Sequence, residues 1–405
     1  MMFLKILVYF KQFGLSRTLS FIRSHIHMYS HKKIKPSGWR NTNEKDKNDA
    51  ARNVAIIGAG KFAFSTIAYF LKIKQKNFLR CVYSPGIKSA ISLCKYYNGL
   101  YVPSDWRDIL KDEKVKLVYI ASPFETHAKY AIACIEAGKN VYIEKPPVVS
   151  ESQLRLLLGS MINNPDSKVF LGFNRSSSKT FNELKKLVAD ESGCITAQCN
   201  MSVNGSPVTN ELRKWEPNNL KSINTDSKIS SEEFPLVSSM SYTDFKILDH
   251  LCHFTDLIVR LIPLDKAFPC VITPNQAPSK DVNLEFSFSI LFADKSHISF
   301  NHKEIPNLLE GMDESIELRK GNLIATLSNF QSLQFELRGK TKDKKSLYRD
   351  HGHESSIQKA YVLTCDHQGG GESIEYVEAT SKLYLRVAEA MNNMVPTEVN
   401  LDRDM

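Results

Sequence analysis

The residues in this chain that are best suited to chemistry lie in two short motifs, each of which ends an apolar run. Residues 53–60 read Asn-Val-Ala-Ile-Ile-Gly-Ala-Gly, and residues 144–147 read Glu-Lys-Pro-Pro. In the first motif Gly58 permits a tight turn from strand to helix, Gly60 lets the backbone approach a pyrophosphate, and Ala63 allows close helix packing. The second motif places an ammonium group at a strand end, where open parallel sheets bind their ligands. Together the motifs indicate a dinucleotide site with a lysine beside it.

A third cluster of polar side chains, residues 249–256, reads Asp-His-Leu-Cys-His-Phe-Thr-Asp. A spacing of four places Asp249 and His253 on one face of a helix expected over residues 247–261. The histidine can act as a general base or acid near neutral pH, and the aspartate can hydrogen-bond it or a substrate hydroxyl. Lys145, desolvated beside a cationic nicotinamide, is expected to have a lowered pKa. These three are the candidate catalytic residues. The alternative for Lys145 is a surface lysine at a strand end, and the alternative for Asp249 and His253 is a buried helix with a satisfied histidine.

Polar residues also follow two further strand ends. His127 opens a helix after a strand expected over residues 115–121, and Asn174 and Arg175 follow a strand expected over residues 169–173. His127 is a candidate contact for the cofactor or the substrate, and Arg175 has the planar donors to bind an anionic substrate group. A structural histidine and a salt bridge within the protein are the respective alternatives.

The end of the second strand bears on the choice of cofactor. NAD-binding folds commonly place an acid there for the ribose diol, whereas this chain reads Tyr83-Ser84-Pro85-Gly86-Ile87-Lys88. Ser84 and Lys88 tolerate a 2′-phosphate but do not select for one. NAD and NADP therefore both remain open.

The elements that position these residues follow from hydrophobic periodicity. After the first motif, strands are expected over 78–83, 115–121, 141–143 and 169–173, alternating with helices over 62–72, 87–97, 127–137 and 150–161. This alternation predicts a right-handed, doubly wound parallel sheet. Strands then dominate, over 194–203, 284–292, 296–302, 314–320, 323–328 and 333–338, with helices over 179–189, 247–261, 354–365 and 372–391. Their alternating pattern predicts a mostly antiparallel sheet with one face packed on helices.

Several of these segments together resemble a known family. Residues 121–127 read Ala-Ser-Pro-Phe-Glu-Thr-His, and residues 137–146 read Ala-Gly-Lys-Asn-Val-Tyr-Ile-Glu-Lys-Pro. With the first motif they resemble the Gfo/Idh/MocA family of glucose-fructose oxidoreductase, inositol dehydrogenase and many nucleotide-sugar dehydrogenases, over roughly residues 53–395. Gly-Phe-Asn-Arg at 172–175 and Cys-His-Phe-Thr-Asp-Leu at 252–257 resemble its branch in bacterial surface-polysaccharide clusters.

The resemblance implies a fold, a cofactor and a set of contacts. The implied fold is α/β: an N-terminal Rossmann domain with a doubly wound parallel sheet, followed by an α+β domain whose open, mostly antiparallel sheet makes homodimers or homotetramers. The implied cofactor is NAD or NADP, and the implied substrate is a small-molecule sugar or nucleotide-sugar. Cofactor contacts are expected from Gly58, Gly60, Lys61, Phe62, Ser84, Lys88, Ser122, Pro123, His127, Glu144 and Lys145. Substrate contacts are expected from Lys145, Asn174, Arg175, Asp249 and His253, and a cis bond between Lys145 and Pro146 is consistent with the proline.

The chain departs from the family just before the Asp-His helix. Family members usually carry Gly-Gly there, whereas this chain has Thr-Asp-Phe-Lys at 243–246 and no glycine between Gly205 and Gly311. The connector over 204–242 is longer than usual and rich in Ser, Asn and Pro, which makes it a candidate substrate lid. The identity of the substrate and the direction of the reaction therefore cannot be borrowed from a relative.

The first 51 residues need a separate interpretation. Residues 1–42 carry eight basic and no acidic side chains, with apolar residues on both sides of Gly14. The apolar stretch is too short and too charged to span a bilayer. An organellar transit peptide, an amphipathic helix pair on an anionic membrane, and a helical extension packed on the body or on a partner remain. Because residues 30–51 resemble a polar linker, we expect removal of 1–51 to leave the body folded. The expected division is 1–51, 52–175, 176–395 and a tail at 396–405.

Composition limits the remaining classes. The formal net charge of +9 over 405 residues comes almost wholly from the leader, so a basic nucleic-acid face on the body is not supported. The eight cysteines form no C-x-x-C pair, which indicates reduced core thiols in a cytoplasmic protein and no metal site. The sequence thus predicts a cytoplasmic NAD(P)-dependent dehydrogenase or reductase that acts on a CH–OH group of a sugar or nucleotide-sugar in polysaccharide biosynthesis. A bound-NAD glycosidase or isomerase, a non-catalytic dinucleotide sensor, and an organellar location are the alternatives.

Overall fold

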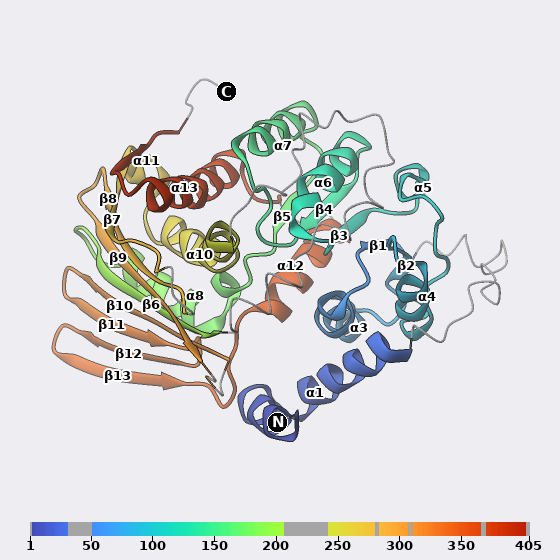
Figure 1. The fold of residues 1–405 in the computed structure, drawn as a ribbon, viewed down its shortest axis with the longest axis horizontal. Helices are drawn as coiled ribbons and strands as arrows, with labels where there is room; N and C mark the ends of the chain where they lie inside the picture. Colours follow the sequence, from blue (N-terminus) through green and yellow to red (C-terminus); the bar gives the residue numbers. More distant parts are fainter. Residues whose placement is uncertain are drawn as a thin grey trace.

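Two β-sheets organise the chain, a parallel sheet in the N-terminal half and a larger sheet in the C-terminal half (Figure 1). The computed structural model describes residues 2–30, 51–205, 242–279, 283–306, 308, 311–365 and 370–401. The candidate lid over 204–242 and the polar linker over 30–51 therefore lie almost wholly outside the described residues.

The first sheet is parallel, with the strand order β2-β1-β3-β4-β5. Its strands are β1 (Val54–Ile57), β2 (Leu79–Tyr83), β3 (Leu117–Ile120), β4 (Asn140–Ile143) and β5 (Val169–Leu171). They are buried and almost continuously apolar, as is typical of a parallel sheet covered on both faces. The helical elements between them are η3 (Ala63–Ile67), α3 (Ala68–Lys74), α4 (Ile87–Tyr96), α5 (Arg107–Lys111), η4 (Phe124–Thr126), α6 (His127–Glu136) and α7 (Glu151–Asn163). The predicted doubly wound sheet is confirmed.

The second sheet has the order β13-β12-β11-β10-β6-β9-β8-β7-β14. Its strands are β6 (Thr196–Gly205), β7 (Cys270–Gln276), β8 (Glu285–Phe292), β9 (His297–Pro306), β10 (Met312–Lys320), β11 (Leu323–Ser328), β12 (Ser332–Leu337), β13 (Lys340–Lys345) and β14 (Thr397–Val399). The pairing of β6 with β9 is parallel and the other described pairings are antiparallel. The predicted, mostly antiparallel sheet is therefore confirmed.

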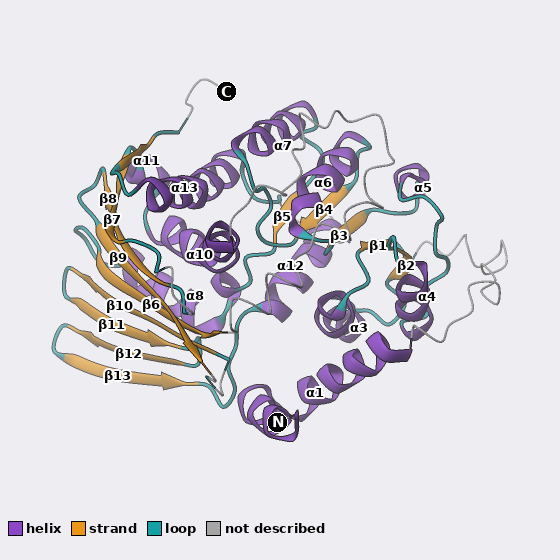
Figure 2. Cartoon of the chain, in the orientation of Figure 1, coloured by secondary structure: helices purple, strands orange, loops and turns teal. Residues whose placement is uncertain are grey.

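Helices cover one face of this second sheet and connect it to the first. They are η5 (Arg175–Ser177), α8 (Lys179–Ala189), α10 (Tyr242–Leu261), α11 (Leu264–Ala267), α12 (His353–Cys365) and α13 (Ile374–Asn393). Figure 2 shows α10 and α13 on the inner side of the curved sheet, and α12 between the two sheets. Alternate residues of β8, such as Phe286 and Phe288, are buried toward these helices. The arrangement brings α10 toward the end of β4.

Three strands of the second sheet were not predicted from the sequence: β7, β13 and β14. The segment expected to be a tail, 396–405, contains β14, in which Thr397 pairs with Ile272 of β7. The cysteines agree better with expectation, because the seven whose side chains are described carry free thiols and six of these are buried.

The N-terminal helix α1 (Met2–Ser30) packs on the nucleotide domain (Figure 1). Gly14 has a φ of 78° and a ψ of 176°, which breaks the helix where its apolar pattern is interrupted. Beyond the break, Nη1 of Arg17 donates to the carbonyl of Ser65 at 2.5 Å, within the π-helical turn η3. The ring of His27 stacks on that of Phe64, with centroids 4.4 Å apart. These contacts correspond to the helical extension packed on the body, and they lead us to expect a cost in stability when residues 1–51 are removed.

The first half of α1 contacts the segment that precedes α12. The backbone N–H of Arg349 donates to the carbonyl of Gln12 at 2.8 Å, and the rings of Phe13 and His351 meet edge to face at 5.7 Å. The helix therefore connects the nucleotide domain to the C-terminal half of the chain. No helix in the described part of the protein is both long enough and apolar enough to cross a membrane.

Candidate active site

The turn after β1 is built around Gly58. This residue has a φ of +102°, and a Cβ atom there would lie 2.3 Å from the carbonyl oxygen of Ala121. Its N–H donates to the carbonyl of Tyr83 at 2.8 Å, so the ends of three neighbouring strands meet at this glycine. A Cβ on Gly60 would meet nothing within 4 Å. The backbone of this turn is therefore open to a close approach, as a pyrophosphate requires.

The other residues expected to contact the cofactor surround this turn. Lys61 is exposed at the start of the following helix, and the ring of Phe62 lies 5.8 Å from that of His353. Ser84 lies between β2 and α4, with Lys88 in the first turn of α4. Ser122 and Pro123 follow β3, where the Ser122 hydroxyl accepts a hydrogen bond from Thr126 at 2.7 Å. The fold thus collects these side chains at one edge of the parallel sheet.

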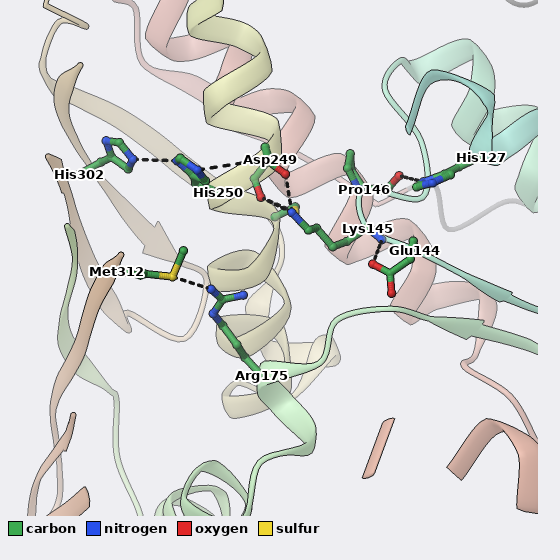
Figure 3. Close-up of polar contacts among 10 residues, drawn as sticks. His127, Glu144, Lys145, Pro146, Arg175, Asp249, His250, His302 and Met312 are labelled. Carbon is green, nitrogen blue, oxygen red and sulfur yellow. Dashed lines mark hydrogen bonds and ion pairs between the residues drawn. The ribbon is translucent and has the colours of Figure 1, made fainter. Parts of the chain in front are cut away.

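Lys145 and Asp249 form the central ion pair of the site, although they are 104 residues apart (Figure 3). Lys145 follows β4, and its peptide bond to Pro146 is cis. Asp249 lies on α10. The Lys145 ammonium donates to the Asp249 carboxylate and, at 3.1 Å, to the Asp249 backbone carbonyl. Two residues predicted to be catalytic are therefore brought together.

This pairing reverses the pKa shift that we expected for Lys145. Desolvation is the largest influence and by itself lowers the pKa of this lysine. The Asp249 carboxylate, followed by Cys252, more than offsets that effect, so the pKa of Lys145 is raised. The expectation of a lowered pKa is thereby corrected. At neutral pH Lys145 is an ammonium group, suited to donate a hydrogen bond and a proton.

Two histidines that we did not predict extend the ion pair toward the second sheet. Nε2 of His250 lies 3.6 Å from the Asp249 carboxylate, and its Nδ1 lies 3.0 Å from Nε2 of His302 on β9. Figure 3 shows the resulting line of side chains from the sheet to Lys145. His250 stands inside the motif that identified its neighbours, whereas no local pattern marks His302. These histidines can orient Asp249 and, through it, Lys145.

His253 is buried one helical turn beyond Asp249. Its ring meets that of Phe173 edge to face at 6.2 Å. Its Nδ1 has no hydrogen-bond partner within the described residues. Desolvation, then Arg175 and Lys145, hold the pKa of His253 well below its usual range. It is therefore neutral at physiological pH, with one ring nitrogen available to a ligand.

Arg175 and Asn174 contact the protein itself. Nε of Arg175 donates to the Glu314 carboxylate at 2.6 Å. An Nη atom of Arg175 lies 3.0 Å from the Met312 sulfur, as Figure 3 shows. The Asn174 side chain donates to the His351 carbonyl at 2.6 Å. Both side chains are buried. The salt-bridge alternative for Arg175 is thus what the structure shows, and Asn174 supports the segment before α12.

His127 also has a supporting position. Its Nδ1 lies 2.9 Å from the Pro146 carbonyl, and its Nε2 lies 2.9 Å from the Ser122 carbonyl. A contact with the cofactor or substrate was expected, but both ring nitrogens face backbone carbonyls, and the single N–H of the neutral ring donates to one of them. His127 therefore fixes the loop after β3 against the cis Lys-Pro segment, and burial lowers its pKa to about 4.

Glu144 is buried between β4 and Gly172. One carboxylate oxygen accepts from the N–H of Lys145 at 3.3 Å, and the other has no partner within the described residues. Burial, only partly offset by Lys145, raises the pKa of Glu144 to about 8. The side chain is therefore mostly protonated at neutral pH, and its unpartnered oxygen lies against Gly172.

Buried neutral histidines predict a loss of stability in mild acid. The pKa of His127 is about 4 and that of His351 about 3 in the folded protein, against 6.5 in an unfolded chain. Below pH 6.5 the unfolded state binds protons that the folded state does not, so stability is lost as the pH falls toward 4. His127 alone accounts for roughly 3 kcal/mol of this loss.

We expect Tm to fall less steeply between pH 7 and pH 4.5 in His127→Gln than in the wild type. The exposed control His297→Gln should leave this slope unchanged. An unaltered slope in His127→Gln would contradict the assignment.

The site fits a bound dinucleotide, because the backbone of the turn at Gly60 is open to a close approach. Residues 52–161 match the Gfo/Idh/MocA family, described as the oxidoreductase family with an NAD-binding Rossmann fold. The nucleotide-binding domain belongs to the Gfo/Idh/MocA family. The recognition of an NAD(P)-dependent oxidoreductase of this family is thereby confirmed, and the choice between NAD and NADP stays open.

Individual relatives show how far the similarity extends. Oxidoreductase P35 of Formosa agariphila is 23% identical over 275 residues, which are 67% of this chain and 78% of that protein. Inositol 2-dehydrogenase 2 of Saccharopolyspora erythraea is 29% identical over 137 residues, 34% of this chain and 40% of that enzyme. The structure of GenD2 from gentamicin A biosynthesis in complex with NAD superposes with a TM-score of 0.65 at 18% identity, covering 91% of this chain and all of GenD2. At that identity the last comparison supports the fold alone.

Proposed function

We propose that this Gfo/Idh/MocA protein interconverts a secondary alcohol and a carbonyl on a sugar or nucleotide-sugar, in the assembly of a surface polysaccharide. The observation that carries the proposal is the Lys145–Asp249 ion pair at the end of β4, with His253 one turn further along α10. The inositol dehydrogenase among the relatives acts on a cyclic polyol, which supports a polyhydroxylated substrate. The resemblance of residues 172–175 and 252–257 to polysaccharide-cluster enzymes supports the biosynthetic role.

The residues of the site divide the proton chemistry between them. When bound, NAD(P) supplies the hydride acceptor or donor. The Lys145 ammonium donates a hydrogen bond to the substrate oxygen and passes it a proton when a carbonyl is reduced. When an alcohol is oxidised the same path runs in reverse, so the hydroxyl proton returns to Lys145, and neutral His253 accepts a hydrogen bond from the substrate. The raised pKa of Lys145 supports a proton donor, and the lowered pKa of His253 supports a neutral hydrogen-bond acceptor.

Nicotinamide absorbance in the presence of a panel of substrates tests this function. The panel contains cyclic polyols, free sugars and nucleotide-sugars, each assayed with NAD and with NADP. Gly60→Asp, which places a carboxylate against the pyrophosphate, is expected to abolish cofactor binding and turnover while the chain stays folded. Tight binding of NAD(P) by the wild-type protein with no turnover on any substrate class would favour the dinucleotide sensor. Wild-type cofactor affinity in Gly60→Asp would show that the turn is misassigned.

We propose that the protein is a homo-oligomer that associates through the uncovered face of the second sheet. The paired residues Val271 and Leu291 are exposed on that face, as is Ile324 further along the sheet. Exposed apolar side chains on an open sheet commonly mark an interface. Sedimentation equilibrium is expected to give a dimer or tetramer for the wild type and a smaller species for Leu291→Asp. A monomeric wild type would contradict the interface.

The outer face of α1 supports a peripheral membrane contact for an otherwise cytoplasmic protein. Leu15 and Ile26 are each 60% exposed, and Lys11 and Arg23 are exposed beside them. An apolar face flanked by cations, in a leader without acids, suits an anionic lipid surface. Vesicles containing phosphatidylserine are expected to sediment the wild type, and Leu15→Asp to weaken this. Equal sedimentation with neutral vesicles would contradict an electrostatic contribution. Val395→Asp is the control, because it introduces the same charge at an exposed residue outside α1.

A further inference from the structure

A cavity lies apart from the catalytic residues. It has a volume of about 560 Å³ and is enclosed by β5, the start of α8, the last turn of α10 and the first turn of α12. Lys145, Asp249 and His253 do not line it. It therefore offers a binding volume that the oxidoreductase reaction does not use.

Cations outnumber carboxylates in the lining of this cavity. The charged residues in the lining are Lys179, Lys185, Lys186, Arg260, Lys359, Glu183 and Glu372. Both carboxylates already have partners, because Glu183 pairs with Lys344 outside the lining and Glu372 accepts from Arg260 at 2.9 Å. Arg260 is also paired with Asp256 at 2.8 Å. The four lysines consequently give the cavity an excess of positive charge.

Lys185 and Lys359 are the two lysines of the lining that repel each other. No hydrogen bond or ion pair in the described part of the chain holds either ammonium group. Desolvation, followed by repulsion from Arg260, lowers the pKa of Lys185, and Lys359 adds to that repulsion. Asp256 and Glu372 oppose the shift without reversing it. An anion placed between these groups would offset the repulsion that Asp256 and Glu372 leave.

Neutral hydrogen-bond donors complete the lining. The hydroxyls of Ser177 and Ser355 and the amide of Asn182 stand among the lysines. Ammonium, hydroxyl and amide donors together match the oxygens of a phosphate or sulfate group, which accept hydrogen bonds from all three. A carboxylate-lined or apolar cavity of the same volume would not favour such a group.

We propose that this cavity is a second binding site, specific for a phosphate or sulfate group that is either a free ion or carried by a sugar. The site is joined to the catalytic residues by α10, because Arg260 follows His253 by seven residues, about 10 Å along the helix. Phe173 adds a second link, since it lines the cavity and packs edge-on against His253. The proposal does not depend on the substrate assigned to the catalytic site.

Calorimetric titration of the full chain at constant ionic strength tests the site. The ligands are inorganic phosphate, glucose 6-phosphate, glucose and chloride. The wild type is expected to bind the first two and not the last two. Lys185→Ala/Lys359→Ala should weaken this binding by about tenfold or more, since each lost charge-assisted hydrogen bond accounts for roughly that factor. Lys340→Ala/Lys345→Ala removes the same charge from the exposed strand β13 and is expected to bind like the wild type.

The outcomes separate the two sources of the ligand. Equal affinity for phosphate and glucose 6-phosphate identifies the free ion as sufficient, whereas tighter binding of the sugar phosphate shows that the serines and Asn182 hold the sugar. Unchanged affinity in the Lys185/Lys359 variant, an equal loss in the β13 control, or no binding of either phosphate would overturn the proposal. NAD(P) titrated in parallel reports on the catalytic site, so failure of one site is not mistaken for failure of the other.

Discussion

Lys145→Ala is expected to slow hydride transfer about a hundred- to ten-thousandfold, the usual cost of losing general acid-base help. The variant loses the proton donor and also the ammonium that anchors the substrate oxygen. Cofactor affinity should stay within a few fold, because Lys145 lies at the end of β4 and the open turn lies at the end of β1. Single-turnover absorbance of the nicotinamide measures the step directly. Near wild-type rates in this variant would remove Lys145 from the mechanism.

Two matched variants distinguish the proton from the charge. Lys145→Arg keeps the positive charge but cannot release a proton at working pH, so it should recover substrate binding and not the rate. Asp249→Asn removes the group that raises the pKa of Lys145, and the limb of the pH-rate profile that reports this lysine should move to lower pH. A profile that does not move would show that Asp249 acts on something other than Lys145.

The nucleotide domain was predictable because its signals are local. A strand buried on both faces is a continuous apolar run, and a glycine with positive φ against a neighbouring carbonyl tolerates no other residue. Gly58, which follows the apolar strand β1, has a positive φ, and a Cβ there would lie 2.3 Å from the Ala121 carbonyl oxygen. The edge of the sheet at which ligands bind then follows from topology, and Lys145 was placed there correctly.

Pairings between distant segments were not predictable in the same way. Arg175 pairs with Glu314, 139 residues further along the chain, and no sequence pattern around either residue predicts this pairing. The sign of the Lys145 pKa shift depends on Asp249 at hydrogen-bond distance, while the sequence reveals only a shared edge. His302 lies in an ordinary alternating strand, and its contact with His250 exists because β9 packs under α10. Site chemistry was thus foreseeable in its residue types and not in its partners.

The sequence left three alternatives for the leader for a related reason. Its basic, acid-free composition indicates targeting or a membrane surface, whereas the face that packs on the body carries polar side chains. Ser20 and Ser24 are buried, and Oγ of Ser20 donates to the Ser65 carbonyl at 3.2 Å. Polar side chains buried against a particular partner resemble a solvated face in sequence, so periodicity alone did not reveal the packing.

Removal of residues 1–30 is accordingly expected to destabilise the nucleotide domain and weaken dinucleotide binding. His27 is the decisive contact: its Nδ1 lies 2.7 Å from the Ser92 hydroxyl, and its Nε2 lies 3.4 Å from the carbonyl of Ala59, between the two glycines of the cofactor turn. Losing the ring stack on Phe64 and these hydrogen bonds costs about 3 kcal/mol. In a chain of this size that lowers Tm by roughly 3 to 4 °C.

Single substitutions in α1 test this account without removing the helix. His27→Ala should reproduce most of the loss in Tm and reduce NAD(P) affinity, because the cofactor turn loses its support at Ala59. Leu15→Ala, on the exposed face of the same helix, should change neither quantity. Differential scanning calorimetry with and without cofactor provides both measurements. If the shortened chain melts at the wild-type temperature and binds NAD(P) normally, α1 is a passive appendage and its contacts with η3 and α4 contribute nothing to the site.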